Sequence, residues 1–325
     1  MPLAGAAPNL AGMSRSSPLW GRLFSATLAL GVIGLAAWLL HRYLHAMRWR
    51  DFAAAWQALS ARAIVASAAA TCVSFAMLAA FEMQAARLSA HGRVSLRRAA
   101  FAGVVCNAIG NMLGFHAITA SAVRYRIYGA VGLGAGDTAR IVGLAGMGVG
   151  LGFAVVITGA LIWQPTIVDG WGRWPGLGLA LALAGLLAWL GRSPRTLRLF
   201  GWTLKFPDAR AAGLQMAIGG VEMCGAIAAL HVLLPAAVAP SFVDFLPVYV
   251  AAVLAGLVSH APGGLGVFES ILLAGFPQAQ RPDVLAAILC YRLTYTAGPF
   301  VLGSLAFGAF EWRLRRRRRA QTVAG

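Results

Sequence analysis

Four ionisable side chains lie within long apolar runs of this 325-residue sequence: Glu82, Glu222, Glu269 and Arg292. A charge at the centre of a bilayer costs about 2.5–3.5 kcal/mol, so such residues usually face a partner or a polar cavity. Glu269 and Arg292 can pair with each other or line a polar path for a headgroup or a proton. Glu82 lies near the end of its run, where it either snorkels or has a function. Glu222 lies near the middle of its run, which favours a function or an internal ion pair.

Arg124 and Arg126 flank Tyr125 at the expected edge of the membrane. Two guanidinium groups near an interface suit a phosphate, because each can offer forked donors. The alternative is that they anchor this end of the chain on the cytoplasmic side. His116 and His260 can bind a ligand or carry a proton, or they can form structural hydrogen bonds. Neither has the acidic or histidine neighbours of a metal site, so we expect no metal and no cofactor.

Two segments, 107–121 and 259–269, are rich in residues that interrupt helices, with three glycines and one proline within 262–266. Irregular backbone is tolerated at membrane depth only where protein or a water-filled cavity satisfies it. A pair of such segments in the two halves of a chain points to the binding site of a transporter. We expect gating or re-entrant roles for Asn107, Asn111, Gly114, His116, Pro262 and Gly266.

The composition indicates which elements position these residues. Apolar residues make up 59% of the chain and charged residues 11%, with a mean hydropathy of +0.73. This excludes a disordered chain, a disulfide scaffold and an ordinary soluble enzyme. The sequence predicts an all-α, polytopic helical bundle of about eight transmembrane helices plus re-entrant broken segments. The expected spans are 23–40, 63–83, 139–163, 175–191, 211–234, 245–258 and 284–310, with a shorter apolar run at 270–276.

The domain organisation follows from the same patterns. We expect a disordered N-terminal tail over 1–18, a single transmembrane domain over 19–312 and a basic cytoplasmic tail over 313–325. Residues 51–60 have the spacing of an interfacial amphipathic helix.

The chain carries 27 basic and 10 acidic residues, a net charge of +17. The positive-inside rule places most of this charge in the cytoplasm if both termini are cytoplasmic and residues 99–120 return to the side from which they enter. Four arginines in the loop at 41–62 do not follow the rule. The arginine-rich tail lacks the alternating aromatic residues of a nucleic-acid site, so we expect no nucleic-acid partner.

Motifs for nucleophilic, metal-dependent or ATP-driven catalysis are missing from the sequence: it has no GxSxG, HExxH or P-loop. We therefore expect no catalytic residue and no enzymatic activity.

Three stretches resemble one known family. The octapeptide 121–128 (SAVRYRIY) resembles the RYRLY signature of the lysylphosphatidylglycerol synthase transmembrane region, a flippase-like domain. The stretch 259–269 (SHAPGGLGVFE) resembles its SHxPGGLGVFE signature, and Tyr291-Arg292 resembles its closing YR. The sequence departs from the family at Glu82, where many members have aspartate, and at Ala261, where a branched residue is commoner.

The resemblance implies a helical bundle with re-entrant segments that moves or binds lipid in a bacterial inner membrane. In full-length members a separate cytosolic domain is the lysine transferase, and we expect this chain to be a stand-alone member without it. Our leading hypothesis is translocation of an amphiphilic, anionic lipid between leaflets. The residues expected to bind it are Arg124, Tyr125, Arg126, Glu222, His260, Gly263, Gly264, Glu269 and Arg292.

Two alternatives remain open at this point. One is a non-transporting lipid-binding scaffold that docks a separate lipid-modifying enzyme through the loop at 192–210 or the basic tail. The other is a membrane enzyme that uses glutamate and histidine as acid and base. The sequence specifies neither the lipid, the direction, the energy source nor the oligomeric state.

Overall fold

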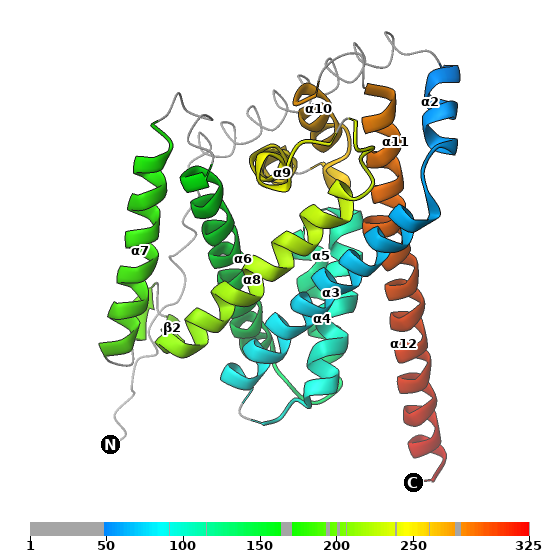
Figure 1. Cartoon of the computed structure of the whole chain (residues 1–325). Helices are drawn as coiled ribbons and strands as arrows, with labels where there is room; N and C mark the ends of the chain where they lie inside the picture. The colour runs from blue at the N-terminus through cyan, green and yellow to red at the C-terminus, as the bar shows by residue number, and fades with distance from the viewer. Residues whose placement is uncertain are drawn as a thin grey trace, which may run out of the picture.

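The computed structural model describes residues 49–90, 92–114, 116–163, 171–192, 196–199, 202–205, 207–237, 239–259, 261–276 and 281–324. The tail expected over 1–18 and the span expected over 23–40 lie outside these ranges. The described helices, shown in Figure 1, are α2 (Trp49–Gln57), α3 (Ala61–Ser89), α4 (Leu96–Leu113), α5 (His116–Gly129), α6 (Ala135–Trp163), α7 (Arg173–Arg192), α8 (Ala209–His231), α9 (Phe242–Ser259), α10 (Val267–Ala274), α11 (Arg281–Tyr291) and α12 (Gly298–Ala324).

Four short elements connect these helices in the described part of the chain. The 3-10 turn η2 (Pro262–Gly264) joins α9 to α10, and the π-helical segment η4 (Arg292–Ala297) joins α11 to α12. The strands β1 (Thr196–Leu199) and β2 (Trp202–Lys205) pair antiparallel between α7 and α8, in a stretch expected to be a basic loop.

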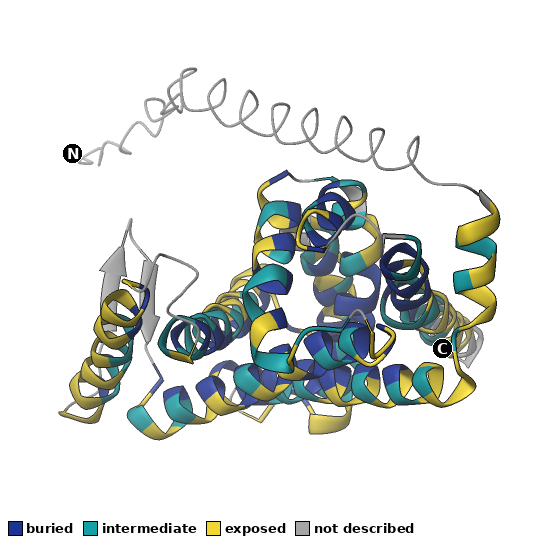
Figure 2. Ribbon diagram, turned by 45° about the horizontal axis from the view of Figure 1, so that its top comes forward, coloured by how far each residue is buried: buried dark blue, intermediate teal, exposed yellow. Residues whose placement is uncertain are grey.

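The predicted helical membrane bundle is confirmed for the described part of the chain. Six stretches there are long and apolar enough to cross a membrane: α3, α6, α7, α8, α9 and the continuous stretch Pro282–Arg317. Side-chain caps fix the starts of three helices, with Ser60 before α3, Ser95 before α4 and Asp208 before α8. In Figure 2 the buried residues gather in the central helices, whereas α7 at the edge of the bundle is largely exposed.

Helices α4 and α5 form a hairpin that enters and leaves the bundle at the same end. Arg93, just before α4, contacts Asp137, in the first turn of α6, with 2.6 Å between Nη2 and Oδ2. The start and end of the α4–α5 segment therefore lie side by side. The turn between the helices begins at Gly114, whose φ of 71° favours glycine. This supports the prediction that residues 99–120 return to the side from which they enter.

Helices α9 and α10 form a second hairpin through η2. A Cβ atom on Gly275, just after α10, would lie 2.8 Å from Val248 in the first half of α9, so the chain doubles back on itself. The turn is made by Gly263, Gly264 and Gly266, which all have positive φ angles. Figure 1 looks along the axis of α9, while α7 and α12 run lengthwise in the same view.

The tips of the two hairpins contact each other. A Cβ atom on Gly263 would lie 3.3 Å from the carbonyl oxygen of Asn111 and 3.4 Å from that of Met112, in the last turn of α4. In Figure 1 the α4–α5 hairpin rises from the end of the bundle that holds the C-terminus, and α10 lies at the opposite end. We call the end that holds the C-terminus the basic end. The fold thus brings the two predicted broken segments together.

Helix α12 extends the bundle at the basic end. It continues without a break through the arginine-rich residues 313–319 to Ala324, and its lower part projects beyond the neighbouring helices in Figure 1. The predicted basic tail, 313–325, therefore continues the last membrane helix as far as Ala324. Within this stretch of α12 the Arg316 guanidinium lies 4.4 Å from the ring centroid of Trp312.

Candidate functional site

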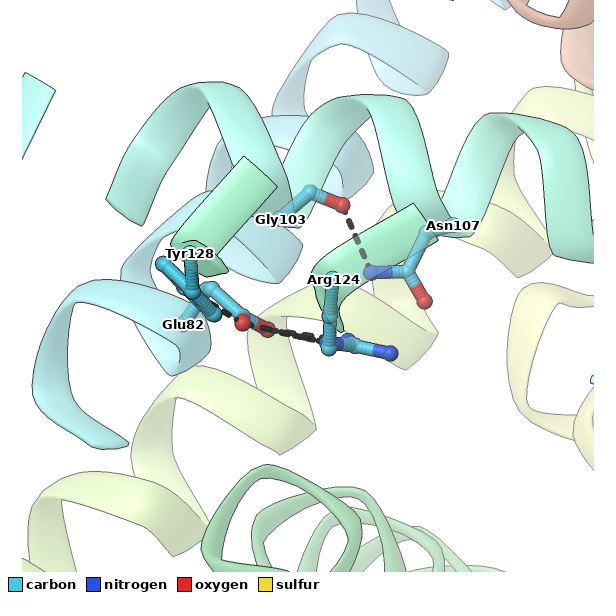
Figure 3. Close-up of polar contacts among 5 residues, drawn as sticks. All are labelled: Glu82, Gly103, Asn107, Arg124 and Tyr128. Atoms are coloured by element: carbon cyan, nitrogen blue, oxygen red, sulfur yellow. Dashed lines mark hydrogen bonds and ion pairs between the residues drawn. The ribbon is translucent and has the colours of Figure 1, made fainter. Parts of the chain in front are cut away.

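The first polar cluster joins α3 to α5 (Figure 3). The Nε of Arg124 donates to both carboxylate oxygens of Glu82 at 3.0 Å, and Nη2 donates to Oε2 at 2.8 Å. The hydroxyl of Tyr128 donates to Oε1 of Glu82 at 2.7 Å. Glu82 is 0% exposed and Arg124 5% exposed. Glu82 is therefore an internal partner of Arg124, and the snorkelling alternative does not apply.

Helix α4 provides the space for this cluster. A Cβ atom on Gly103 would lie 2.8 Å from the Cβ of Glu82 and 2.9 Å from the carbonyl oxygen of Leu78. One turn later Asn107 donates from Nδ2 to the carbonyl oxygen of Gly103 at 2.7 Å (Figure 3). Because Gly103 has no side chain, α4 packs directly against the stretch of α3 that carries Glu82.

Arg124 and Arg126 do not form a joint site. Arg126 pairs with Glu311 of α12 through bonds of 2.7 and 2.8 Å, and both partners belong to the surface at the basic end. Residues two apart on a helix point to opposite sides, so Arg124 faces α3 while Arg126 faces α12. Tyr125 between them is exposed. The expectation that the two guanidinium groups would meet a headgroup together is corrected: only Arg126 and Tyr125 lie at the surface.

The second polar cluster surrounds Glu222 in the middle of α8. Ser74 of α3 donates to its Oε1 at 2.9 Å, and the hydroxyl of Tyr295 in η4 reaches the same oxygen at 3.4 Å. Ser74 and Tyr295 also bond each other at 2.9 Å. Among the described residues no cation lies within ion-pair distance of Glu222. The internal ion pair considered for this residue is therefore not present in that part of the chain.

The third polar cluster joins η4 to the tip of the α9–α10 hairpin. Arg292 donates from Nε to Oε1 of Glu269 at 2.7 Å and from Nη1 to the carbonyl oxygen of Gly263 at 2.6 Å. The other carboxylate oxygen of Glu269 accepts from the backbone N–H of Gly266 at 2.7 Å. The guanidinium lies 4.8 Å from the ring centroid of Phe268. The predicted pairing of Glu269 with Arg292 is confirmed, and it holds the hairpin turn in place.

An aromatic column connects the second and third clusters. Tyr295 stacks on Tyr291 with 5.0 Å between ring centroids, and Tyr291 stacks on Phe268 at 5.9 Å. Tyr249 of α9 shares a hydroxyl hydrogen bond of 2.7 Å with Tyr291. Contacts therefore run without interruption from Glu222 through these rings to the residue beneath Arg292.

The backbone at η4 has an unusual geometry that fits its position. It is π-helical, and the N–H of Gly298 bonds the carbonyl oxygen of Leu293, five residues earlier. Pro299 follows, and it has no N–H with which to continue the ladder. Single-turn π segments occur often at functional sites. Here the segment carries both Arg292 and Tyr295, one from each of two polar clusters.

One face of α3 contributes to the first two clusters and also contacts η4. Ser67 bonds Thr294 of η4 at 3.0 Å, Ser74 bonds Glu222, and Glu82 bonds Arg124. All three side chains on α3 are buried, at helical spacing. A line of polar groups thus crosses the apolar bundle along α3.

The other predicted residues lie near the hairpin tips or outside the described part. Asn111 is in the last turn of α4 and Gly264 in η2, while His116 begins α5. His260 lies outside the described residues. No group of three or more metal-ligating side chains occurs in the described ranges.

Sequence reasoning missed the hydroxyl groups. Tyr128 could have been found, because it lies four residues after Arg124 and therefore on the same helical face. Ser74, Tyr249 and Tyr295 offered no such signal, since their partners belong to other helices.

No family model matches the sequence. The chain is 28% identical over 287 residues to an uncharacterized protein of Synechocystis sp., covering 86% of this chain and 88% of that protein. It is 36% identical over 91 residues, 27% of its length, to the phosphatidylglycerol lysyltransferases of Staphylococcus aureus strains MRSA252 and COL. That match spans 10% of the lysyltransferase length. With the six apolar stretches of its described part, the chain is thus a multi-pass helical membrane protein with partial similarity to a lipid-modifying enzyme.

Proposed function

We propose that this chain moves an amphiphilic lipid with an anionic headgroup between the leaflets of a bacterial inner membrane. A protein with this function must shield a polar headgroup inside the bilayer while the acyl chains stay in hydrocarbon. It therefore needs polar groups at membrane depth and a barrier that opens to each side in turn.

The observation that carries the proposal is the meeting of the two hairpin tips. The α4–α5 hairpin comes from the basic end and the α9–α10 hairpin from the opposite end, and Gly263 contacts the last turn of α4. Re-entrant backbone at membrane depth is stable only inside protein or beside a water-filled cavity. Withdrawal of either tip would open the centre of the bundle toward one side.

Arg292 is the best candidate to bind the headgroup. Its guanidinium holds the Gly263 carbonyl and Glu269, and its side chain remains 16% exposed. A phosphate offers the same forked acceptor geometry as the carboxylate of Glu269 and can compete with it for Arg292. Competition of this kind would release the turn at Gly263 when a headgroup binds, since the same guanidinium holds both.

The ends of the bundle support an orientation. The ion pair of Arg93 with Asp137 joins the start of the α4–α5 hairpin to α6, Arg126 pairs with Glu311 of α12, and α12 carries its arginines to the end that holds the C-terminus. By the positive-inside rule this end belongs in the cytoplasm, together with both termini. Tyr125 and Arg126 would then meet headgroups of the cytoplasmic leaflet, and Arg124 would act inside the bundle through Glu82.

A leaflet-resolved assay tests the proposal. Purified protein is placed in liposomes with fluorescent phosphatidylglycerol, cardiolipin or a neutral lipid, and dithionite quenches the outer leaflet. We expect quenching to pass one half only with protein and to be fastest with the anionic lipids. Arg292→Gln should reduce the rate at least tenfold, whereas Arg97→Gln, at an exposed position on α4, should not change it.

A plateau at one half with every lipid and correctly folded protein would contradict the proposal. It would favour the scaffold alternative instead, for which the exposed arginines of α12 provide a docking surface. Capture of a lipid-modifying enzyme by the wild-type chain, lost when these arginines are replaced by glutamine, would then identify that role.

A further inference from the structure

The buried carboxylates of the bundle differ in how their charge is compensated. Glu82 and Glu269 each contact an arginine, at 2.8 and 2.6 Å. Glu222 is 8% exposed and receives hydrogen bonds only from the hydroxyl groups of Ser74 and Tyr295. In the part of the chain that the structure describes, it is therefore the buried carboxylate without a cationic partner.

The titratable groups around Glu222 are hydroxyls and a thiol. Four elements carry them: Tyr295 lies on η4, Tyr291 on α11, Tyr249 on α9 and Cys224 on α8 itself. Helix α3 provides Ser74. Helix α6 contacts this part of α8 through Gly152 against Gly219, and the titratable residues of α6 and α7 lie at their ends. None of these neighbours can neutralise a carboxylate by ion pairing.

An isolated buried carboxylate is costly. The penalty for burying one ion exceeds what a single hydrogen bond to a charged group returns. One bond of 2.9 Å and one of 3.4 Å offset only part of that penalty. A bound proton removes the charge and leaves a carboxyl group that the same hydroxyls can still bond.

We propose that Glu222 binds and releases one proton in each transport cycle and so couples lipid movement to a proton gradient. This inference rests on the proposed function. The proton enters from the water on one side, converts the carboxylate to a carboxylic acid, and leaves to the water on the other side. No further reactant is required.

The structure provides a connection between this proton and the hairpin tip. A protonated Glu222 can donate a hydrogen bond, whereas the carboxylate can only accept, and protonation weakens the bond that the Tyr295 hydroxyl donates, because the accepting oxygen loses its charge. Tyr295 shares the π-helical segment with Arg292, and Arg292 holds the carbonyl of Gly263. Protonation at Glu222 therefore acts on the segment that fixes the turn between α9 and α10.

The test measures the equilibrium distribution of the lipid under a pH gradient. Liposomes that contain the protein and fluorescent phosphatidylglycerol are prepared at about pH 8 inside and about pH 7 outside. Valinomycin with potassium removes the membrane potential. With one proton per lipid, the leaflet ratio should shift about tenfold from unity. The shift does not depend on protein orientation, because stoichiometry alone sets the equilibrium. Lumenal pyranine reports the matching proton movement.

The variants assign the coupling to Glu222. Glu222→Gln should return the leaflet ratio to one and abolish the lumenal pH change. Asp51→Asn makes the same chemical change at an exposed position on α2 and should behave as wild type. If Glu222→Gln fails to fold, Ser74→Ala with Tyr295→Phe keeps the carboxylate and removes both its donors. That double variant should change the leaflet ratio as well.

Each remaining outcome overturns a defined statement. Lipid movement in the wild type with a leaflet ratio of one under the gradient rejects proton coupling and leaves the proposed function intact. A tenfold ratio that persists in the folded Glu222 variant and in the double variant assigns the proton to another group and rejects the role of Glu222. Absence of lipid movement at any pH rejects both the coupling and the proposed function.

Discussion

The role of an arginine in this bundle depends on which helix its side chain faces. Arg124 and Arg126 have the same side chain and are separated by one residue. Yet Arg124 is buried against Glu82, and Arg126 lies at the surface against Glu311. The rotation of about 100° per residue along a helix separates them. The same rotation brings Tyr128 to Glu82 beside Arg124.

At the residue scale, the absence of a side chain at Gly103 is a testable requirement. Gly103→Ala would place a Cβ 2.8 Å from Glu82 and 2.9 Å from a backbone oxygen of α3. Because that backbone cannot move freely, we expect the free energy of unfolding to fall by about 1–3 kcal/mol. Thermal unfolding in detergent, followed by size-exclusion chromatography, measures the loss.

A matched control is available on α6. A Cβ on Gly143 meets nothing within 4 Å, so Gly143→Ala should be neutral or slightly stabilising, since alanine favours a helix more than glycine does. Equal destabilisation by both substitutions would mean that the contact between α3 and α4 is not what Gly103 provides.

At the scale of elements, the sequence predicted the interruptions in the helices but not all of their partners. Glycine and proline at 262–266 predict a turn at membrane depth, and the structure has η2 there. The pair Glu269–Arg292 was also predictable, because both residues are isolated charges in apolar runs. In contrast, Ser74 and Glu222, which contact each other, are 148 residues apart in the sequence and lie on different helices. No local pattern encodes such a contact, and serine is common in membrane helices for packing alone.

The π-helical geometry of η4 and the hairpin β1–β2 were also outside the reach of sequence patterns. A π segment differs from a regular helix by a shift in hydrogen bonding, so the apolar periodicity around it reads as one helix. Pro299 is the sequence signal closest to it, since proline removes a donor from the helical ladder.

The α4–α5 hairpin predicts the accessibility of its two ends. Cysteines introduced at Arg97 and Gly134 in a chain without its four native cysteines should react with a membrane-impermeant maleimide from the same side. Both positions are exposed near the basic end, so we expect labelling in inside-out vesicles and little in right-side-out vesicles. Labelling of the two positions from opposite sides would show that residues 99–120 cross the membrane completely.

At the scale of the whole molecule, the charge of the chain is concentrated where α12 leaves the bundle. Arginines near an anionic membrane surface contribute about 1 kcal/mol each. We therefore expect phosphatidylglycerol or cardiolipin in mixed micelles to raise the melting temperature more than a zwitterionic lipid does. Replacing Arg315, Arg316 and Arg317 by glutamine should remove most of this difference, and so should about 0.5–1 M salt, at which the Debye length approaches 3 Å.

The comparison of lipids in the same micelles is the control for that prediction. A melting temperature that rises equally with anionic and zwitterionic lipids would show that the effect comes from contacts with the acyl chains and not from the headgroup charge. The arginines of α12 would then serve only to orient the chain.

The order of the two buried ion pairs along the chain has a consequence for synthesis. In each pair the acid precedes its arginine: Glu82 by 42 residues and Glu269 by 23. At about 5–20 residues per second, Glu82 leaves the ribosome about 2–8 s before Arg124, and Glu269 about 1–5 s before Arg292. During each interval a glutamate already destined for the bundle interior has no partner. The insertion machinery must therefore keep α3 and α10 beside water or beside itself until the later helix is made, which sets the order in which the two halves of the bundle assemble.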